Sequence, residues 1–372
     1  MMLRVPFALA LSLSWSAVVA AQDVDNRNSP VFLERSYIFH RFAPDDLLFE
    51  AHLAPHLFFH QGLYQDAGEI YQAPDFAARS WSLSFTPMVR LRMFSTRSNP
   101  VRTPSFMPKF NVQFFWASLI DPSLRLDSPI RILALNAIPW GHHSNGQEGC
   151  LYADQTMDAN GNCLDGVLPP GARRTTNKLN GTFSTNYFRM WGSYRHMRLD
   201  DLDPDQQLRA NQICTFTLGV EGNPQPFGPG TIPNEQKALY PTMRIISAVE
   251  LSWREFRKSW VNGRMSGAAQ VEYLRTVAPH LSPWTFSAEL SQTLHRLGGW
   301  GLFVRYYRGM DYYNLGFLDH TRYVHVGLVF DAIRSDEFGL PANVAPVRGP
   351  ARTPSLTRRL MGALDRVCTL VT

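Results

Sequence analysis

A histidine and a serine two positions apart, His142 and Ser144, are the residues of this chain whose types and spacing could do chemistry. They follow the apolar run from Ile130 to Ile138, which is typical of a β-strand. Because successive strand side chains point to opposite faces, His142 and Ser144 should project to the same side. An imidazole within reach of a hydroxyl can remove its proton and make the oxygen a nucleophile. The spacing therefore indicates a base and a hydroxyl that could act together as a nucleophile.

The surroundings of this pair are apolar rather than polar. Strict alternation predicts that the face carrying His142 continues through Trp140, Ile138, Ala134 and Ile132. Such a face is unusual for an enzyme in water and suits one that works against lipid. A His-x-Ser pair also arises by chance, and the segment from His142 to Gly146 could instead be a polar turn that caps the strand.

Other reactive side chains give weaker signals. His52, His56 and His60 have helical spacing that could suit a metal, but a strand or loop would scatter them. Cys150 and Cys163 flank one loop and could pair in an oxidising compartment. Cys214 and Cys368 have no obvious partner, and none of the four cysteines has the Cys-x-x-Cys spacing of a zinc site.

The elements that would position His142 and Ser144 read as short alternating strands. The chain of 372 residues is 45% hydrophobic and 12% aromatic but only 18% charged, and no apolar run beyond the N-terminus is long enough for a membrane helix. Alternation is clear in residues 79–93, 110–116, 130–144, 183–195, 243–256, 268–277, 284–294, 301–307 and 321–330. This pattern predicts an all-β fold, a transmembrane antiparallel β-barrel, although a soluble all-β protein would look similar.

The chain divides into four predicted parts. Residues 1–21 resemble a secretory signal peptide, with Arg4 before an apolar stretch and small residues before Gln22. Residues 22–50 read as an N-terminal arm with a possible edge strand, 51–330 as the barrel, and 331–372 as a tail with a possible amphipathic helix near 356–370. The net charge of +5 is spread along the chain, so no nucleic-acid partner is expected.

Several segments together resemble one family. His142-His143-Ser144-Asn145-Gly146 matches the His-x-Ser-Asn-Gly motif of outer membrane phospholipase A, and Asn186 matches its third catalytic residue on the following strand. Residues 99–108, 302–307, 311–314 and 321–327 are similar to further segments of that family. The resemblance extends over roughly residues 60–330 and is weak through 196–240.

The resemblance implies a barrel of about twelve strands in the bacterial outer membrane, with long extracellular loops and the catalytic residues on its outer wall. It also implies calcium-dependent hydrolysis of acyl ester bonds in phospholipids and lysophospholipids, by an enzyme that is active as a homodimer. The alternatives are a catalytically silent porin-type or structural barrel, and a soluble periplasmic serine hydrolase. Against the soluble hydrolase, this chain lacks a Gly-x-Ser-x-Gly elbow.

The resemblance also assigns residue roles. Ser144 is the expected nucleophile, His142 the general base and later acid, and Asn186 the group that orients the imidazole. Backbone N–H groups of Ser144 and Gly146 are expected at the oxyanion site.

Calcium ligands are expected at Gln147, Thr182 and Asn99. Asn99, or Ser98 beside it, stands where the family takes a ligand from the second subunit. Glu221 and Glu235 are candidates for an acidic ligand by chain order alone. The loop of residues 147–181 is longer than in the family, which bears on both the calcium geometry and the dimer contact.

Overall fold

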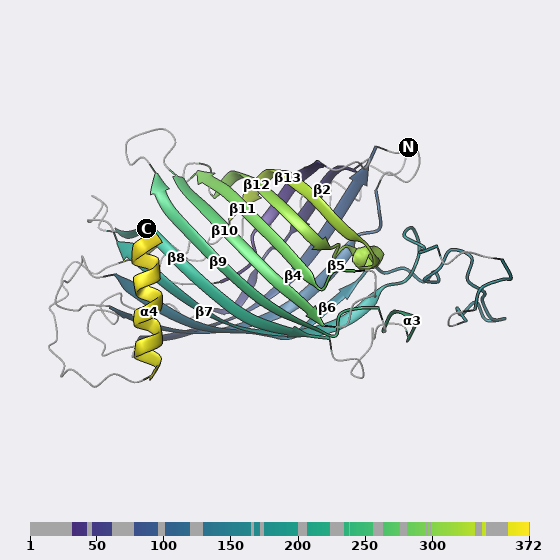
Figure 1. Cartoon of the computed structure of the whole chain (residues 1–372), viewed down its shortest axis with the longest axis horizontal. Helices are drawn as coiled ribbons and strands as arrows, with labels where there is room; N and C mark the ends of the chain where they lie inside the picture. Colours follow the sequence, from purple (N-terminus) through teal and green to yellow (C-terminus); the bar gives the residue numbers. More distant parts are fainter. Residues whose placement is uncertain are drawn as a thin grey trace.

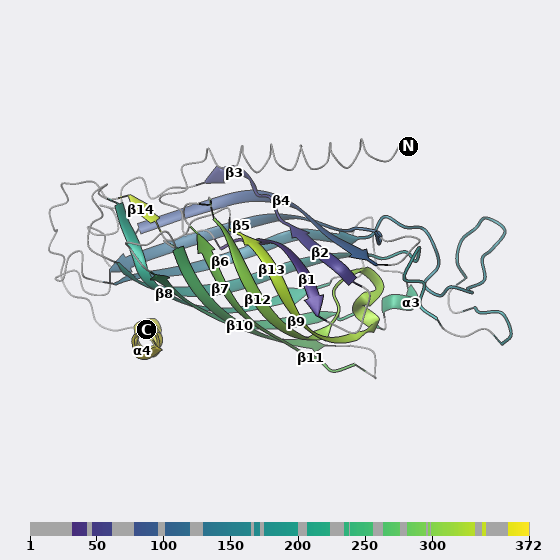
Figure 2. The ribbon, with the colours of Figure 1, turned by 90° about the horizontal axis from the view of Figure 1, so that it is seen from above.

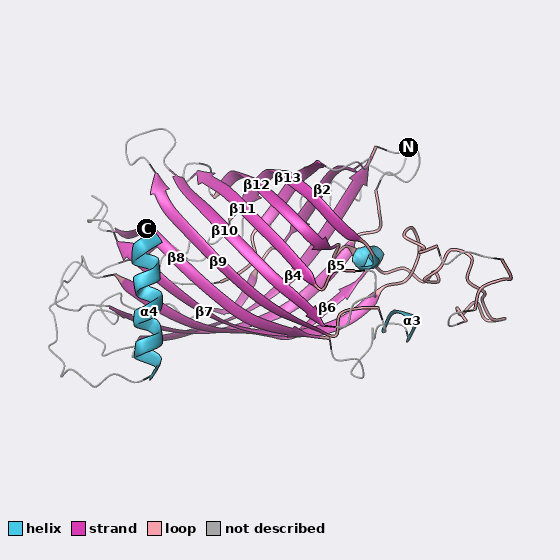
Figure 3. Cartoon of the chain, viewed as in Figure 1, coloured by secondary structure: helices cyan, strands magenta, loops and turns pink. Residues whose placement is uncertain are grey.

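The fold of the chain, taken from a computed structural model, is a closed β-barrel with the helix α4 (Leu356–Val371) packed outside its wall (Figures 1 and 3). The structure describes residues 32–42, 47–61, 78–95, 101–119, 129–164, 167–171, 175–199, 207–223, 234–237, 239–255, 263–275, 281–294, 297, 299–331, 337–339 and 356–371. The predicted signal peptide, residues 1–21, lies outside the described residues. Among the described helices, none is long and apolar enough to cross a membrane.

The strands are β1 (Ser36–Phe42), β2 (Leu47–Leu53), β3 (Leu57–Gln61), β4 (Ala78–Phe94), β5 (Ser105–Leu119), β6 (Ile130–Ser144), β7 (Ser184–Leu199), β8 (Gln207–Gly222), β9 (Met243–Glu255), β10 (Gly263–Arg275), β11 (Trp284–Leu294), β12 (Trp300–Met310), β13 (His320–Phe330) and β14 (Glu337–Gly339). The helices are α3 (Asn234–Lys237), the 3-10 helix η4 (Asn314–Leu318) and α4 (Leu356–Val371).

Twelve antiparallel strands close the barrel, as predicted. The ring runs β1, β2, β4 to β13 and back to β1, and pairing of β8 with β9 and of β1 with β13 leaves no open edge. β3 pairs with the half of β4 that β2 does not reach, so β2 and β3 form one strand interrupted around Pro55. Proline has no N–H to donate to the ladder, which explains the break.

Side chains alternate between a lipid-facing wall and a polar lumen. On β4, Ser82 and Ser84 are buried inside, whereas Trp81 is 42% exposed outside. On β5, Phe110 and Phe114 are exposed outside. An apolar outer belt over a polar interior is the pattern of barrels that cross the outer membrane with their strands. The chain is such a multi-pass barrel, and its longest connection, between β6 and β7, marks the extracellular end.

The barrel begins earlier than the sequence predicted. β1 pairs with β13 from Ser36 to Phe42, and β2 begins at Leu47. Residues 36–42 and 47–50, assigned to an arm, therefore belong to the barrel. The final strand needs a hydrogen-bonding partner to close the ring, and β1 supplies it.

The lumen is crossed by the segment just before β1. Glu34 forms an ion pair with Lys109 on β5 (2.6 Å), while Arg35 on the other side reaches Glu250 on β9 (2.7 Å). Glu34 also lies near Arg189 on β7 (3.9 Å). A cavity of about 520 Å³ remains around this segment.

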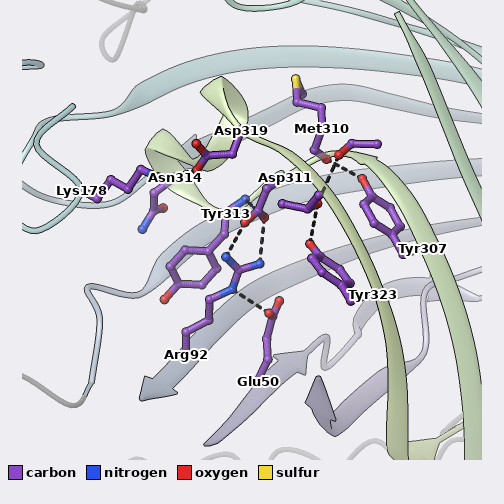
Figure 4. Close-up of polar contacts among 12 residues, drawn as sticks. Glu50, Arg92, Lys178, Tyr307, Met310, Asp311, Tyr313, Asn314, Asp319 and Tyr323 are labelled. Atoms are coloured by element: carbon purple, nitrogen blue, oxygen red, sulfur yellow. Dashed lines mark hydrogen bonds and ion pairs between the residues drawn. The ribbon is translucent and has the colours of Figure 1, made fainter. Parts of the chain in front are cut away.

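Charged groups also fill the extracellular end of the lumen (Figure 4). Arg92 on β4 donates to both carboxylate oxygens of Asp311 (2.6 and 2.8 Å) and to Glu50 on β2 (2.6 Å). Asp311 leads into η4, and Lys178 of the long β6–β7 connection pairs with Asp319 just after η4 (2.5 Å). The network therefore anchors the β12–β13 turn inside the barrel mouth.

Two disulfides complete the fold. Cys150 pairs with Cys163 within the long connection, which confirms that the two cysteines can pair. Cys214 on β8 pairs with Cys368 on α4, a partnership that the sequence did not suggest. The predicted helix near 356–370 is present as α4, and β14 pairs with the start of β8. The region after β13 is thus tied to the barrel at two places.

Candidate active site

A β-bulge decides which way the motif faces. The pairing of β6 with β7 runs regularly to Ile138 and resumes, shifted, at Gly141. Ile138 is buried and lines the lumen cavity, whereas Trp140 is 43% exposed on the outer wall. The extra residue reverses the alternation, because two residues of one strand stand opposite one of its partner.

The prediction that Ile132, Ala134 and Ile138 share the face of His142 is therefore wrong. These three side chains are buried inside the barrel. The outward residues of β6 below the bulge are odd-numbered, including Leu135, which is 42% exposed. His142 still has an apolar surround, but Trp140 and Phe110 supply it (ring centroids 6.2 Å apart).

His142 and Asn186 meet on the outer wall. They are directly opposite one another in the β6–β7 register. The His142 Nδ1 atom lies 2.8 Å from Asn186 Oδ1, and an amide oxygen can only accept, so Nδ1–H donates and Nε2 carries the lone pair. On the lipid side, the indole of Trp140 stacks nearly parallel to the imidazole (6.2 Å, 8°). The imidazole is thus held in one tautomer and one orientation.

Ser144 lies two residues beyond His142 on the same face. Its cross-strand neighbours are Phe106 on β5 and Ser184 on β7. Among the contacts between described residues, no hydrogen bond joins the Ser144 hydroxyl to His142. Catalytic hydrogen bonds are often open without substrate and tighten when it binds. The structure therefore brings His142 and Asn186 into contact and leaves Ser144 beside them.

Gly146 is the second residue predicted to stabilise an oxyanion. Its φ of +63° is a conformation that residues with a Cβ rarely adopt, and an added Cβ would meet no atom within 4 Å. Within the described part of the chain, no backbone carbonyl accepts its N–H. A free N–H just past the predicted nucleophile is the kind of donor that could stabilise a developing oxyanion.

Asn145 joins two strand ends, a contribution that was not predicted from the sequence. Its side chain donates to the Gly181 carbonyl (2.7 Å) and accepts from the Phe183 N–H (3.0 Å), while its own N–H donates to the Phe183 carbonyl (3.1 Å). These bonds hold the ends of β6 and β7 together directly above the His–Asn pair. The signal was its place inside the motif, but its partners lie more than thirty residues away.

The expected calcium site stays a prediction, because the structure describes only part of the expected ligand set. Asn99 and Ser98 lie outside the described residues. The Thr182 carbonyl accepts from Gln236 (2.8 Å), and Gln147 offers only neutral oxygens. No group of three or more acidic, histidine or cysteine ligands is present in the part of the chain that the structure describes. Calcium in proteins is held mainly by carboxylates, so Gln147 and Thr182 do not fit it by themselves.

Glu221 is wrong as the acidic calcium ligand. Its carboxylate lies inside the barrel and is paired with Arg189 (2.5 Å) and Arg244 (3.3 Å). Alternation on β8 sends it to the lumen, away from Thr182. The side chain of Glu235 lies outside the described residues.

The histidines with helical spacing are separated by the strand conformation. His52 contacts Glu50 (2.6 Å), and His56 contacts Thr86 (2.7 Å), both in the lumen. His60 stacks on Trp81 outside the barrel. Each ring thus has a partner of its own.

No known family model matches this chain, and no curated protein is similar to it in sequence. Among solved structures, outer membrane phospholipase A from Escherichia coli aligns over 80% of this chain and 92% of its own, with 9% identity and a TM-score of 0.39. The translocator domain of the autotransporter NalP from Neisseria meningitidis aligns over 87% of this chain and 96% of its own, with 10% identity and a TM-score of 0.27. The beta domain of the Bordetella autotransporter BrkA aligns over 80% and 97%, with 9% identity and a TM-score of 0.25. Likeness at this level says nothing about the chemistry at His142.

Proposed function

We propose that this protein hydrolyses acyl ester bonds of phospholipids and lysophospholipids at the outer membrane, with Ser144 as nucleophile. One observation carries the proposal: a histidine oriented by Asn186 lies beside a serine on the lipid-facing wall. A histidine–amide pair has no structural need to face lipid, because polar groups there cost free energy unless they are used. The motif of residues 142–146 supports the same reaction.

The proposed reaction has two acyl-transfer steps. His142 Nε2 takes the proton from Ser144 Oγ as Oγ attacks the ester carbonyl carbon. The tetrahedral intermediate collapses, the acyl–oxygen bond breaks, and the imidazolium returns its proton to the departing alcohol of the lysophospholipid. Water, deprotonated by His142, then attacks the acyl–enzyme and releases the fatty acid. The N–H groups of Ser144 and Gly146 stabilise the oxyanion in both steps.

Asn186 keeps the imidazole in place throughout. Its amide oxygen accepts from Nδ1 and so leaves Nε2 free to act as the base. A neutral amide stabilises imidazolium less than a carboxylate does, which places more weight on the oxyanion donors.

The substrate is proposed to approach from the membrane. Phe106, Phe110 and Trp140 are all exposed around the motif and would contact acyl chains rather than water. This surface favours a lipid ester over a soluble one.

The direct test is fatty-acid release from phospholipid–detergent micelles by the purified protein. Wild-type protein should release fatty acid, and Ser144→Ala should not. Ser184→Ala is the matched control, because Ser184 is the cross-strand neighbour of Ser144 and should be dispensable. Folding of all three is checked by the shift of the barrel band on heating before electrophoresis. Equal release by wild type and Ser144→Ala would refute the proposal.

A passive barrel is the second candidate and remains open to test. The segment at Glu34 and Arg35 crosses the lumen, and the Arg92 network fills its extracellular end. We therefore expect liposomes that contain the protein not to swell in solutions of small sugars. Rapid swelling together with no esterase activity would favour the porin-type role.

Calcium and a homodimer are proposed as conditions of activity. Because Gln147 and Thr182 supply no carboxylate, we expect activation by calcium at about millimolar concentration, as in weak sites. Activity that rises with protein density in the membrane, in parallel with chemical cross-linking, would support a dimer. Turnover unaffected by a chelator would remove calcium from the proposal.

A further inference from the structure

Outward side chains at the periplasmic end of β7 and β8 are covered. Tyr194, His196 and Cys214 point away from the lumen, yet they are only 4%, 3% and 1% exposed. Farther along the same strands, outward Met190 and Leu218 are 47% and 64% exposed to the lipid. The helix α4 provides the cover.

One face of α4 is fixed to the barrel. Asp365 accepts hydrogen bonds from the Tyr194 hydroxyl and from His196 Nδ1 (3.0 Å), and it pairs with Arg131 (2.9 Å). One turn on, Cys368 is bonded to Cys214. The attachment is therefore both ionic and covalent.

The helix lies across the strands rather than along them. Arg131, His196 and Cys214 are cross-strand neighbours on β6, β7 and β8, so they form one row around the wall. Figures 1 and 2 show α4 outside the barrel and roughly perpendicular to its long direction. A helix in that orientation is parallel to the membrane plane.

The row lies at the edge of the apolar belt. The next outward row towards the membrane centre is Leu133, Tyr194 and Phe216. On the other side, exposed Arg198 bonds to Gln212 (3.3 Å). The helix is thus at the depth where acyl chains give way to headgroups.

The remaining faces of α4 differ in polarity. Consecutive helix residues are about 100° apart, so Val367 and Arg366 flank the barrel contact on opposite sides. Val367 is 45% exposed, and Arg366 is exposed as well. The helix contains three arginines, Arg358, Arg359 and Arg366, and only one acid, Asp365, which the barrel already neutralises.

We propose that α4 is an interfacial helix that binds the phospholipids of the periplasmic leaflet, with its apolar flank at Val367 among acyl chains and Arg366 on anionic headgroups. Continuity with the lipid-facing belt identifies the occupant of the free apolar flank, and the charge of the helix identifies the headgroup. Bilayer-parallel helices with one apolar and one basic side bind in this way. This inference is independent of the proposed enzymatic activity.

The test is nitroxide accessibility on the full-length protein in phosphatidylcholine vesicles. Labels are placed through Val367→Cys and, as the matched control, Gly362→Cys, where open space surrounds the Cα on the same side as Arg366. We expect the ratio of oxygen to nickel-complex collisions to be several-fold higher for the label at 367 than for the label at 362. Oxygen concentrates among acyl chains, and the nickel complex concentrates in water.

Two results would overturn the proposal. If both labels collide mainly with the nickel complex, the helix is solvated. If neither relaxant reaches either label, another protein copy covers the helix.

Headgroup charge is tested by adding phosphatidylglycerol to the vesicles. The oxygen preference of the label at 367 should increase, and the increase should shrink in an Arg366→Gln background. An unchanged preference in anionic vesicles would contradict the assignment of anionic headgroups.

Discussion

The two ends of the β6–β7 pair make the most informative comparison in this molecule. At the extracellular end, His142 Nδ1 bonds to the Asn186 amide oxygen at 2.8 Å. At the periplasmic end, His196 Nδ1 bonds to the Asp365 carboxylate at 3.0 Å. Both histidines point outward from these two strands, but Asp365 belongs to α4.

The two pairs differ in what surrounds them. Within the described residues, His196 Nε2 has no hydrogen-bond partner and is sealed beneath α4, so it can neither give nor take a proton from a substrate. His142 is open to the lipid side, with Ser144 two positions away. A histidine oriented by an oxygen atom can therefore have two different roles. His196, covered by α4, helps to hold that helix on the barrel, whereas His142, open to lipid beside a hydroxyl, is a candidate general base.

The bulge before Gly141 creates this difference on β6. On regular alternation, odd-numbered residues such as Arg131 face outward, which would turn His143 to the lipid. The inserted residue instead sends His142 outward, and His143 faces the lumen, where its Nε2 lies 2.5 Å from Ser105 Oγ. One residue of register thus selects which of two adjacent histidines faces the candidate substrate.

The largest expected effect is the loss of turnover at the extracellular pair alone. Ser144→Ala and His142→Ala should each reduce fatty-acid release by about 10⁴-fold or more, and the double variant should lose little beyond that, because the two residues act as a unit. His196→Ala should leave release unchanged. Assays of the heat-modifiable, folded fractions check this, and comparable losses at His142 and His196 would break the comparison.

Asn186→Ala should have a smaller effect, since it removes orientation and not the base. A hydrogen bond to a group that becomes charged is worth about 1.5–3 kcal/mol, or about 10- to 100-fold in rate. The measurement is kcat on micellar phospholipid. A rate equal to that of wild type would mean that Asn186 has another role.

Gly141→Ala tests the bulge itself. A Cβ at position 141 would lie 2.4 Å from the ring of Tyr187, which fills the lumen beneath it. We expect a destabilised bulge and a several-fold loss of kcat in a barrel that still closes. The matched variant Gly267→Ala, where nothing lies near the added Cβ, should be silent. If Gly141→Ala and Gly267→Ala both had wild-type activity, an intact bulge would not be needed for activity.

The smallest expected effect is the release of α4 by acid. Burial raises the pKa of Asp365, but bonds from His196 and Tyr194 and the charge of Arg131 outweigh it, so the pKa lies below the usual 3.8. The ionised carboxylate therefore contributes its full stabilisation above the usual value, and the contribution is lost as the pH falls through the lowered pKa.

A label introduced by Gly362→Cys can report this release in the Cys214→Ser/Cys368→Ser background, where no disulfide holds the helix. The label should become mobile only in acid. Mobility that is already high at neutral pH would show that the ion pairs do not hold the helix.

Much of the fold could be predicted from alternation. β4, β5 and β7 carry long regular runs such as Trp81-Ser82-Leu83-Ser84-Phe85, and alternate residues of these runs face outward. The strand β8 was not predicted, and the residues of β1 were assigned to the N-terminal arm. The partner that makes β1 a barrel strand, β13, is almost three hundred residues away in sequence.

The residue types and their spacing identified the candidate site, but they did not predict its geometry. Alternation cannot reveal an inserted residue, so the bulge and the true apolar surround of His142 were missed. The pairing of Cys214 with Cys368 spans 154 residues and has no local signal. Long-range partners, rather than local propensity, account for each of these failures.

The most direct measurement of the central claim is covalent labelling of the folded barrel in vesicles with a lipid-like phosphonate ester that traps activated serines. We predict, by peptide mass spectrometry, an adduct on Ser144 in wild-type protein, the same adduct in His196→Ala, and none in His142→Ala. An unmodified Ser144, or an adduct that forms equally without His142, would contradict the account.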